Sequence, residues 1–372
     1  MPNSRNHIAE FGKFGFEEKP LCEADVLAIA QIFYMPFEWV VSEDFTQEPV
    51  SFINAASRVF AMRGGEHKPM GLMINKTPSR VMMMMAATKR YAGLRLAAVK
   101  EVYSRSPAVQ FCAGTFLLPD GTALICFRGT DDTVAGWKED VDLLTRYGTP
   151  SYDLAMDYLT RAAAAFDGDI LLCGHSKGGN IALRTAVMCD PAIRARIKNV
   201  YNFDGPGYFD TSLFEQAAYA ELLPGYRHYV PSDSFIGMLL YHDYDYKAIK
   251  STRLLGPMQH DLASWQVKDG ALWQVKDNDA LSKWVDGAIN SLVERLGTEN
   301  YGALDTVVTA VTEGLNQKTL TDVAKNIREA VNGAAEAYRL VEPAVKEQLH
   351  EAFRKSKNAV AAAAKKATAA VG

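Results

Sequence analysis

A pentapeptide between an apolar run and a helical pattern constrains the fold of this chain more than any other feature. The apolar run DILLC ends at Cys173, GHSKG occupies residues 174–178, and GNIALRTAVMC then carries apolar residues at helical spacing. A strand that turns sharply into a helix needs small residues around the turn, and a serine at that turn stands at the amino terminus of the helix. The pattern therefore predicts a nucleophile elbow with Ser176 as the candidate nucleophile.

The segments around this turn alternate between strand and helix patterns. Strand candidates are VQFCAGTFLLPDGTALICFRGT (109–130, two runs joined by a Pro-Asp-Gly turn), IKNVYNF (197–203) and YRHYV (226–230), and helical spacing covers 23–38, 136–147 and 151–166. Short apolar strands that alternate with helices predict an α/β fold with a mainly parallel sheet covered on both faces. A repeated WQVKD, at 265–269 and 273–277, predicts a hairpin around Asp269 and Gly270.

Composition divides the chain into three parts. We expect an N-terminal helical segment packed on the core at residues 1–107, an α/β catalytic core at 108–296, and a helical extension at 297–372. Beyond Gly297 the sequence is rich in alanine, tryptophan and cysteine are absent, and Pro343 is the only proline. The extension ends in a basic tail, for which we favour a solvated end over contact with an anionic membrane or with nucleic acid.

The charge balance and the cysteine pattern argue against several function classes. With 40 Lys and Arg against 44 Asp and Glu, the net charge is −4, so no basic field favours nucleic acid. The five cysteines include no CxxC pair, and neither a metal nor a cofactor is expected. The chain shows no signal-peptide pattern and no run of about 18 apolar residues, so we expect a soluble cytoplasmic protein.

An activated serine needs a general base and an acid that orients it, and both should follow later strands. Among the downstream histidines, His260 follows a Gly-Pro loop and is preferred as the base; His228 lies within a strand pattern and His242 within a tyrosine-rich segment. For the acid, Asp233 directly follows the strand YRHYV and is preferred over Asp204, which follows the preceding strand.

Acyl transfer also needs two donors that face the developing oxyanion. The backbone N–H of Lys177, directly after the serine, is one candidate. The segment CFRGTDD at residues 126–132 follows an early strand, and its Thr130 offers both an N–H and a hydroxyl. The alternative is that Arg128 and Gly129 only terminate that strand.

Taken together, these residues resemble the fungal-type, or class 3, lipases. FRGT at residues 127–130, Trp137 with Asp140, the GHSKGGNIA elbow, and Asp233 followed by His260 fit that pattern. The chain is more similar still to a bacterial family of uncharacterised lipase-like α/β-hydrolases, through residues 23–38, 174–180, 203–207 (FDGPG) and 260–267 (HDxxSWQV). The resemblance covers about residues 20–296.

The resemblance implies an α/β-hydrolase fold, Ser176 as nucleophile, Asp233 as acid, His260 as base, and Thr130 with Lys177 as oxyanion donors. Secreted class 3 lipases usually carry a signal peptide and often disulfides, and this chain shows neither sign. An extracellular fat-digesting role is therefore not expected.

The expected function is that of a serine hydrolase that cleaves a carboxylic ester through an acyl-enzyme on Ser176. The alternatives are a non-catalytic protein of this fold that binds lipid or a partner, and an acyltransferase. The segment SFIGMLLYHDYDY at residues 234–246 is either the wall or lid of an acyl pocket or a buried helix; its apolar residues are Phe235, Ile236, Met238, Leu239, Leu240, Tyr241 and Tyr244. An acyl ester or lipid is the expected small-molecule partner, and the sequence does not indicate an oligomeric state.

Overall fold

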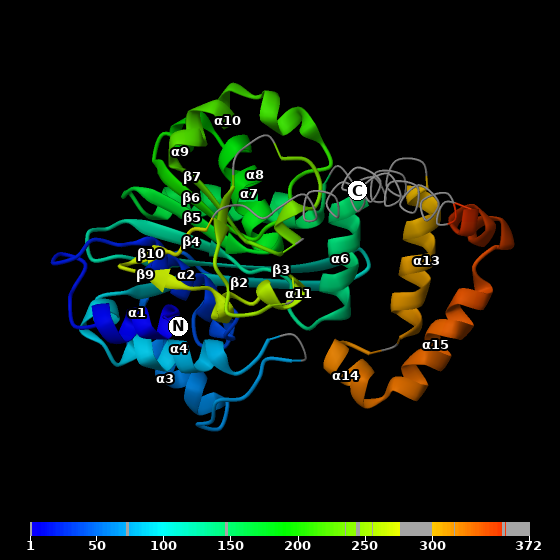
Figure 1. The fold of residues 1–372 in the computed structure, drawn as a ribbon, viewed down its shortest axis with the longest axis horizontal. Coiled ribbons are helices and arrows are strands. Elements are labelled where there is room, and N and C mark those ends of the chain that lie inside the picture. Colours follow the sequence, from blue (N-terminus) through cyan, green and yellow to red (C-terminus); the bar gives the residue numbers. More distant parts are fainter. Residues whose placement is uncertain are drawn as a thin grey trace, which may run out of the picture.

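A computed structural model describes residues 2–71, 74–145, 148–234, 236–242, 246–254, 256–275, 300–315, 317–351 and 354. Its centre is an eight-stranded sheet whose strands lie side by side in chain order (Figure 1). The strands are β1 (Val50–Ser51), β2 (Arg95–Arg105), β3 (Ala108–Leu117), β4 (Ala123–Phe127), β5 (Ile170–His175), β6 (Ile197–Phe203), β7 (Tyr226–Pro231) and β8 (Lys247–Ile249).

The sheet has an antiparallel half and a parallel half. Strands β1 to β4 pair antiparallel, and β3 and β4 are joined by the predicted tight turn, in which Gly121 has a positive φ of 86°. The four pairings from β4 to β8 are all parallel. The predicted α/β class, with a mostly parallel sheet flanked by helices, is confirmed. Strands β1 and β2 precede residue 108 and belong to the same sheet.

Helices cover both faces of this sheet (Figure 1). The helices up to residue 259 are α1 (Ser4–Phe11), α2 (Glu23–Ile32), α3 (Phe52–Met62), α4 (Thr77–Ala86), α5 (Lys89–Ala92), α6 (Val134–Thr145), α7 (Pro150–Ala165), α8 (Lys177–Met188), α9 (Pro191–Arg194), α10 (Ala217–Leu222) and α11 (Gly256–Gln259). Side chains alternate across a strand, so Leu124 and Cys126 of β4 face the apolar layer of α1 to α4. Ile125 and Phe127 face the layer of α7, α8 and α10.

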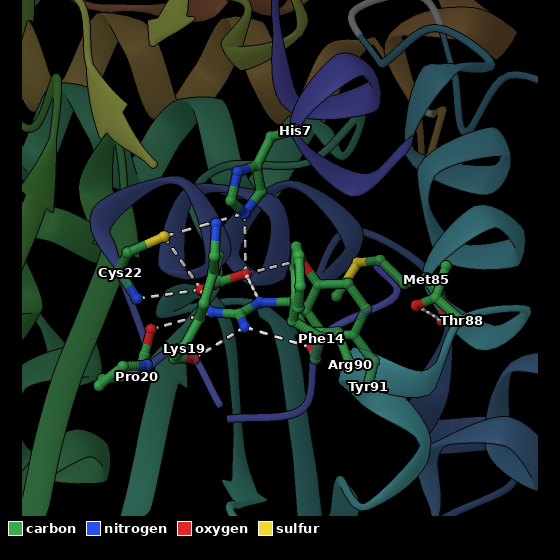
Figure 2. A network of polar contacts seen from close by, with 10 residues as sticks. His7, Phe14, Lys19, Pro20, Cys22, Met85, Thr88, Arg90 and Tyr91 are labelled. Atoms are coloured by element: carbon green, nitrogen blue, oxygen red, sulfur yellow. Dashed lines mark hydrogen bonds and ion pairs between the residues drawn. The ribbon is translucent and has the colours of Figure 1, made fainter. Parts of the chain in front are cut away.

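A buried ion-pair network holds the N-terminal helices together (Figure 2). The fully buried carboxylate of Asp25 on α2 accepts hydrogen bonds from the Arg90 guanidinium on α5, at 2.5 and 2.7 Å. It also accepts from the Tyr91 hydroxyl at 2.8 Å and is paired with Nε2 of His7 on α1 at 2.9 Å. Because a carboxylate in the interior needs such compensation, the network fixes how α1, α2 and α5 meet.

The hairpin predicted around residues 269 and 270 is present as β9 (Val267–Lys268) and β10 (Ala271–Leu272). Asp269 and Gly270 both have positive φ, 52° and 82°, as a two-residue type I′ turn requires.

The C-terminal extension is helical in its described part, as expected. It contains α13 (Tyr301–Gly314), α14 (Leu320–Lys325) and α15 (Ile327–Leu340), and α13 packs against α6 (Figure 1). A Cβ on Gly314 or Gly333 would meet the backbone of the other, so glycines allow α13 and α15 to approach closely. The basic tail expected from residue 355 onward lies outside the described residues. None of the helices in the described ranges is long and apolar enough to cross a bilayer.

Candidate active site

Ser176 occupies a strained turn between β5 and α8. Its φ of 57° and ψ of −131° are unusual for a residue with a side chain, and such strain is typical of a nucleophile elbow. Close packing explains the flanking glycines: a Cβ at Gly174 would clash with the backbone of Gly178, and one at Gly178 with the carbonyl of Phe127. Ser176 itself remains partly exposed, so the predicted elbow geometry is present.

His260 pairs with Asp204, not with the expected Asp233. Nδ1 of His260 lies 2.6 Å from Oδ2 of Asp204, whose side chain is fully buried, while the His260 side chain is 24% exposed. The exposed Asp233 instead accepts a hydrogen bond from Nε2 of Gln259 at 2.8 Å, and its own N–H donates to Gln259 Oε1. The prediction of Asp233 as the residue that orients His260 is wrong, and Asp204, the rejected alternative, takes that position.

The order of the strands in the sheet explains why Asp204, and not Asp233, lies next to His260. Strands β5 and β6 are neighbours, and His175 is paired with Phe203. The N–H of Ser176 donates to the Phe203 carbonyl at 2.9 Å, so Asp204 follows directly across from the serine. Asp233 follows β7, one strand further away, and neighbouring strands are about 4.8 Å apart.

The Asp204 carboxylate is held by further donors. The hydroxyl of Ser234 donates to Oδ2 at 2.6 Å, and the N–H of Gly237 donates to Oδ1 at 3.0 Å. A carboxylate favours the N–H form at the nearer nitrogen of His260, which leaves Nε2 with a lone pair to accept a proton. This is the tautomer that a general base requires.

His175, next to the serine in sequence, positions the His260 backbone. Nε2 of His175 lies 2.9 Å from the His260 carbonyl, which can only accept, so this nitrogen carries the proton. Nδ1 then accepts from the Tyr34 hydroxyl on the chain after α2, at 2.8 Å. Burial lowers the pKa of His175 well below its usual value, and a positive charge on the nearby His260 would act in the same direction. His175 is therefore a neutral bridge between the N-terminal layer and the candidate base.

The FRGT loop after β4 packs directly against the elbow. A Cβ on Gly129 would clash with the His175 carbonyl and the Tyr34 hydroxyl, and would lie 3.1 Å from Cβ of Ser176. Thr130 is the next residue, and its hydroxyl donates to Oδ1 of Asp140 on α6 at 2.6 Å. Lys177 opens α8, where the first N–H groups lack acceptors within the helix. The two expected oxyanion donors thus belong to segments that flank Ser176.

Asp140 accepts the hydrogen bond of the Thr130 hydroxyl, and water has little access to its carboxyl group. Burial raises the pKa of Asp140 to about 6, although the Lys177 charge and the Thr130 hydrogen bond oppose the change. When Asp140 is ionised, the single Thr130 hydroxyl proton points to its carboxylate, and the Thr130 N–H is the donor that remains for an oxyanion.

The Lys177 side chain forms a second buried pair that the sequence did not reveal. Its Nζ donates to Oε2 of Glu139 on α6 at 2.6 Å and to the backbone carbonyl of Gln110 on β3 at 2.7 Å. Oε1 of Glu139 accepts from the Ser151 hydroxyl of α7 at 2.5 Å. A buried ammonium and carboxylate with all these partners tie the elbow helix to three other elements.

The segment proposed as an acyl-pocket wall is described only in part. Residues 236–238 form a short 3-10 turn, so this described part is not a long buried helix, and Gly237 in it contacts Asp204. Leu239 and Leu240 are buried, whereas Tyr241 is 47% exposed. Phe235 and Tyr244 lie outside the described residues.

One cluster in the described residues has the composition of a metal site. His7, Cys22 and Asp25 place possible ligand atoms within 4.8 Å of one another. Arg90 already occupies both oxygens of the Asp25 carboxylate, and burial next to that carboxylate raises the pKa of the Cys22 thiol to about 12. A bound cation would lie against the Arg90 guanidinium, so we interpret the cluster as the ion-pair network of Figure 2.

Three comparisons place the chain among known proteins. Residues 85–308 match the sequence model of a family described as Mbeg1-like. No curated protein matches. Two solved structures are similar: a Rhizomucor miehei lipase propeptide complex (TM-score 0.37, 14% identity, 63% of this chain and 81% of that one) and a mutant form of MDLA from Penicillium cyclopium (TM-score 0.35, 11% identity, 63% and 83%).

Proposed function

The chain belongs to the Mbeg1-like family, and we propose that it is a serine hydrolase that cleaves carboxylic esters through an acyl-enzyme on Ser176. The observation that carries the proposal is the 2.6 Å pair between His260 and the buried Asp204, beside a strained serine elbow. A histidine oriented by a carboxylate next to such a serine is the arrangement that activates a hydroxyl.

The reaction follows from the roles of these groups. Nε2 of His260 takes the Ser176 proton as Oγ attacks the ester carbonyl, and Asp204 stabilises the imidazolium. The N–H groups of Lys177 and Thr130 are the proposed donors to the negative oxygen. His260 then gives the proton to the leaving alcohol, and the same base activates water to release the acid and regenerate Ser176.

Exposed apolar side chains support an ester with an apolar acyl group. Met258, two residues before His260, is 52% exposed, and Leu254 on the preceding loop is 93% exposed. Trp137, three residues before Asp140 on α6, is 41% exposed.

We further propose that the protein works in a reducing compartment, the cytoplasm. This proposal is supported by the five cysteines, all of which are free thiols.

Fluorophosphonate labelling, located by peptide mass mapping, tests the proposal. We expect the wild-type protein to be labelled at Ser176 and the Ser176→Ala variant to lose both the label and ester hydrolysis. The matched control is Ser57→Ala on the exposed side of α3, which should label and hydrolyse like the wild type.

The outcomes separate the alternatives. No label on a folded wild-type protein would overturn catalysis and favour a non-catalytic role in binding lipid or a partner. A label at Ser176 with ester product formed only when an alcohol is added would favour acyl transfer over hydrolysis. Undiminished hydrolysis by Ser176→Ala would contradict the mechanism.

A further inference from the structure

A short piece of the C-terminal extension lies along the chain that follows the FRGT loop. We call residues 317–321 the strap. The N–H of Leu320 donates to the Asp132 carbonyl at 2.7 Å, and the N–H of Val134 donates to the Lys318 carbonyl at 3.0 Å. Between them, Thr133 and Thr319 form an antiparallel bridge. The two hydrogen bonds lie on either side of the Thr133–Thr319 bridge, so the strap holds the backbone of residues 132–134 in place.

Side chains reinforce this backbone pairing. Oδ2 of Asp132 accepts from the N–H of Thr321 at 3.1 Å, and the Arg105 guanidinium of β2 donates to the Gln317 carbonyl. Asp132 and Thr133 are buried, with 6% and 8% of their surface exposed. Buried backbone groups left without partners are costly, so these bonds hold the loop in one position.

A second anchor fixes the extension to α6. Nζ of Lys138 lies 3.0 Å from Asp305 of α13 and 2.9 Å from Asp142 on its own helix. Lys138 is buried, and its charge is shared between the two carboxylates. The extension therefore contacts both ends of the segment from residue 132 to residue 138.

That segment begins beside the reacting centre. Thr130 is two residues before Asp132, and Gly129 packs against the elbow. Asp140, which holds the Thr130 hydroxyl, lies between Lys138 and Asp142 on α6. The family match ends at residue 308, so the strap lies beyond the matched part of the chain.

We propose that the strap is a positioning element for the oxyanion donor: it holds residues 132–134 so that Thr130 stays aligned with Ser176. This inference rests on the proposed hydrolase function. Donors of an oxyanion act mainly in the transition state, so a loosened strap should lower kcat while leaving KM nearly unchanged.

The test is Leu320→Pro in the full-length protein. Leu320 is the first residue of α14, where proline is tolerated, and the preceding Thr319 is already extended, with φ of −124° and ψ of 155°. Proline removes the N–H that reaches Asp132, whereas the matched control Leu320→Ala shortens the side chain and keeps that N–H.

We expect Leu320→Pro to lower kcat for a soluble ester, and the rate of fluorophosphonate labelling, about fivefold relative to Leu320→Ala. Amide hydrogen exchange of residues 129–134 should accelerate in Leu320→Pro alone. Equal kcat in the two variants would overturn the proposal, and so would a fall in kcat without faster exchange. If the wild type neither labels nor hydrolyses, the hydrolase function fails, and exchange alone then shows whether the strap holds the loop.

Discussion

Asp204 receives three hydrogen-bond donors in a fully buried position at the end of β6, where its φ is 55°. Such a carboxylate can hold a histidine in one tautomer without competition from water. Asp233 is exposed and engaged by Gln259. Both aspartates follow parallel strands in the sequence, but Asp204 follows β6, which pairs with the serine-bearing strand β5, whereas Asp233 follows β7, which does not.

The first prediction at this scale compares two isosteric changes. Asp204→Asn places an amide against Nδ1 of His260, which favours the wrong tautomer, so kcat/KM for a short-chain p-nitrophenyl ester should fall roughly 10³- to 10⁴-fold. Asp233→Asn should change it by less than about threefold, because Asp233 contacts Gln259 rather than the base. Steady-state kinetics of both variants decide the assignment, and a larger loss in Asp233→Asn would return the acid to that residue.

At the scale of elements, sequence patterns predict the helices, strands and turns that are formed by residues close together in the chain. Strand β5, the elbow and α8 follow one another in sequence, so glycine spacing and apolar periodicity were enough to place Ser176. Strand β2 escaped prediction because its alternation is interrupted: Ala98 has a φ of 52°, and the register with β3 shifts between Ala97 and Lys100. The Asp204–His260 pair and the Lys177–Glu139 pair join segments that are far apart in the chain. No regular spacing of residues in the sequence indicates that such segments meet, so neither pair could be predicted.

A glycine comparison tests the contact between the FRGT loop and the elbow. Gly129→Ala puts a methyl group into the His175 carbonyl and the Tyr34 hydroxyl, so the loop must move away from Ser176. We expect serine labelling to slow at least tenfold and the free energy of unfolding to fall by about 1–3 kcal/mol. The control is Gly302→Ala in α13, where a Cβ meets no atom within 4 Å; it should be neutral or slightly stabilising. Unfolding by urea and labelling kinetics provide the two measurements, and a fully active Gly129→Ala would contradict the packing.

At the scale of the whole molecule, the N-terminal helices form one of the two apolar layers that bury the sheet. They are attached through charge as well as apolar packing, because Asp25 joins α1, α2 and α5. Burial alone would raise the pKa of Asp25, but the hydrogen bonds from Arg90 and His7 outweigh it and hold the pKa well below its usual value. Asp25 is therefore ionised in the folded protein at neutral pH.

The buried pair of Asp25 and Arg90 predicts how the free energy of unfolding depends on pH. A carboxyl whose folded pKa is depressed stabilises the protein above its unfolded pKa, near 3.9, and that contribution is lost as pH falls through the folded pKa. We expect Asp25→Asn to lower the free energy of unfolding at pH 7 by about 3–5 kcal/mol, since Arg90 is left as an uncompensated buried charge. Below pH 4 the wild type should lose stability more steeply than the variant. Urea unfolding from pH 3 to 7 measures both slopes, and parallel curves would show that Asp25 contributes nothing to acid sensitivity.

The chain order of the eight strands also bears on how this protein becomes active during synthesis. Each strand pairs with the one made just before it, so the sheet can grow as the chain leaves the ribosome. Ser176 is made before the other parts of the site: His260 follows 84 residues later, and the strap follows His260. A growing chain thus carries its nucleophile long before its base and its loop support, so catalytic competence is a late event in the life of each molecule.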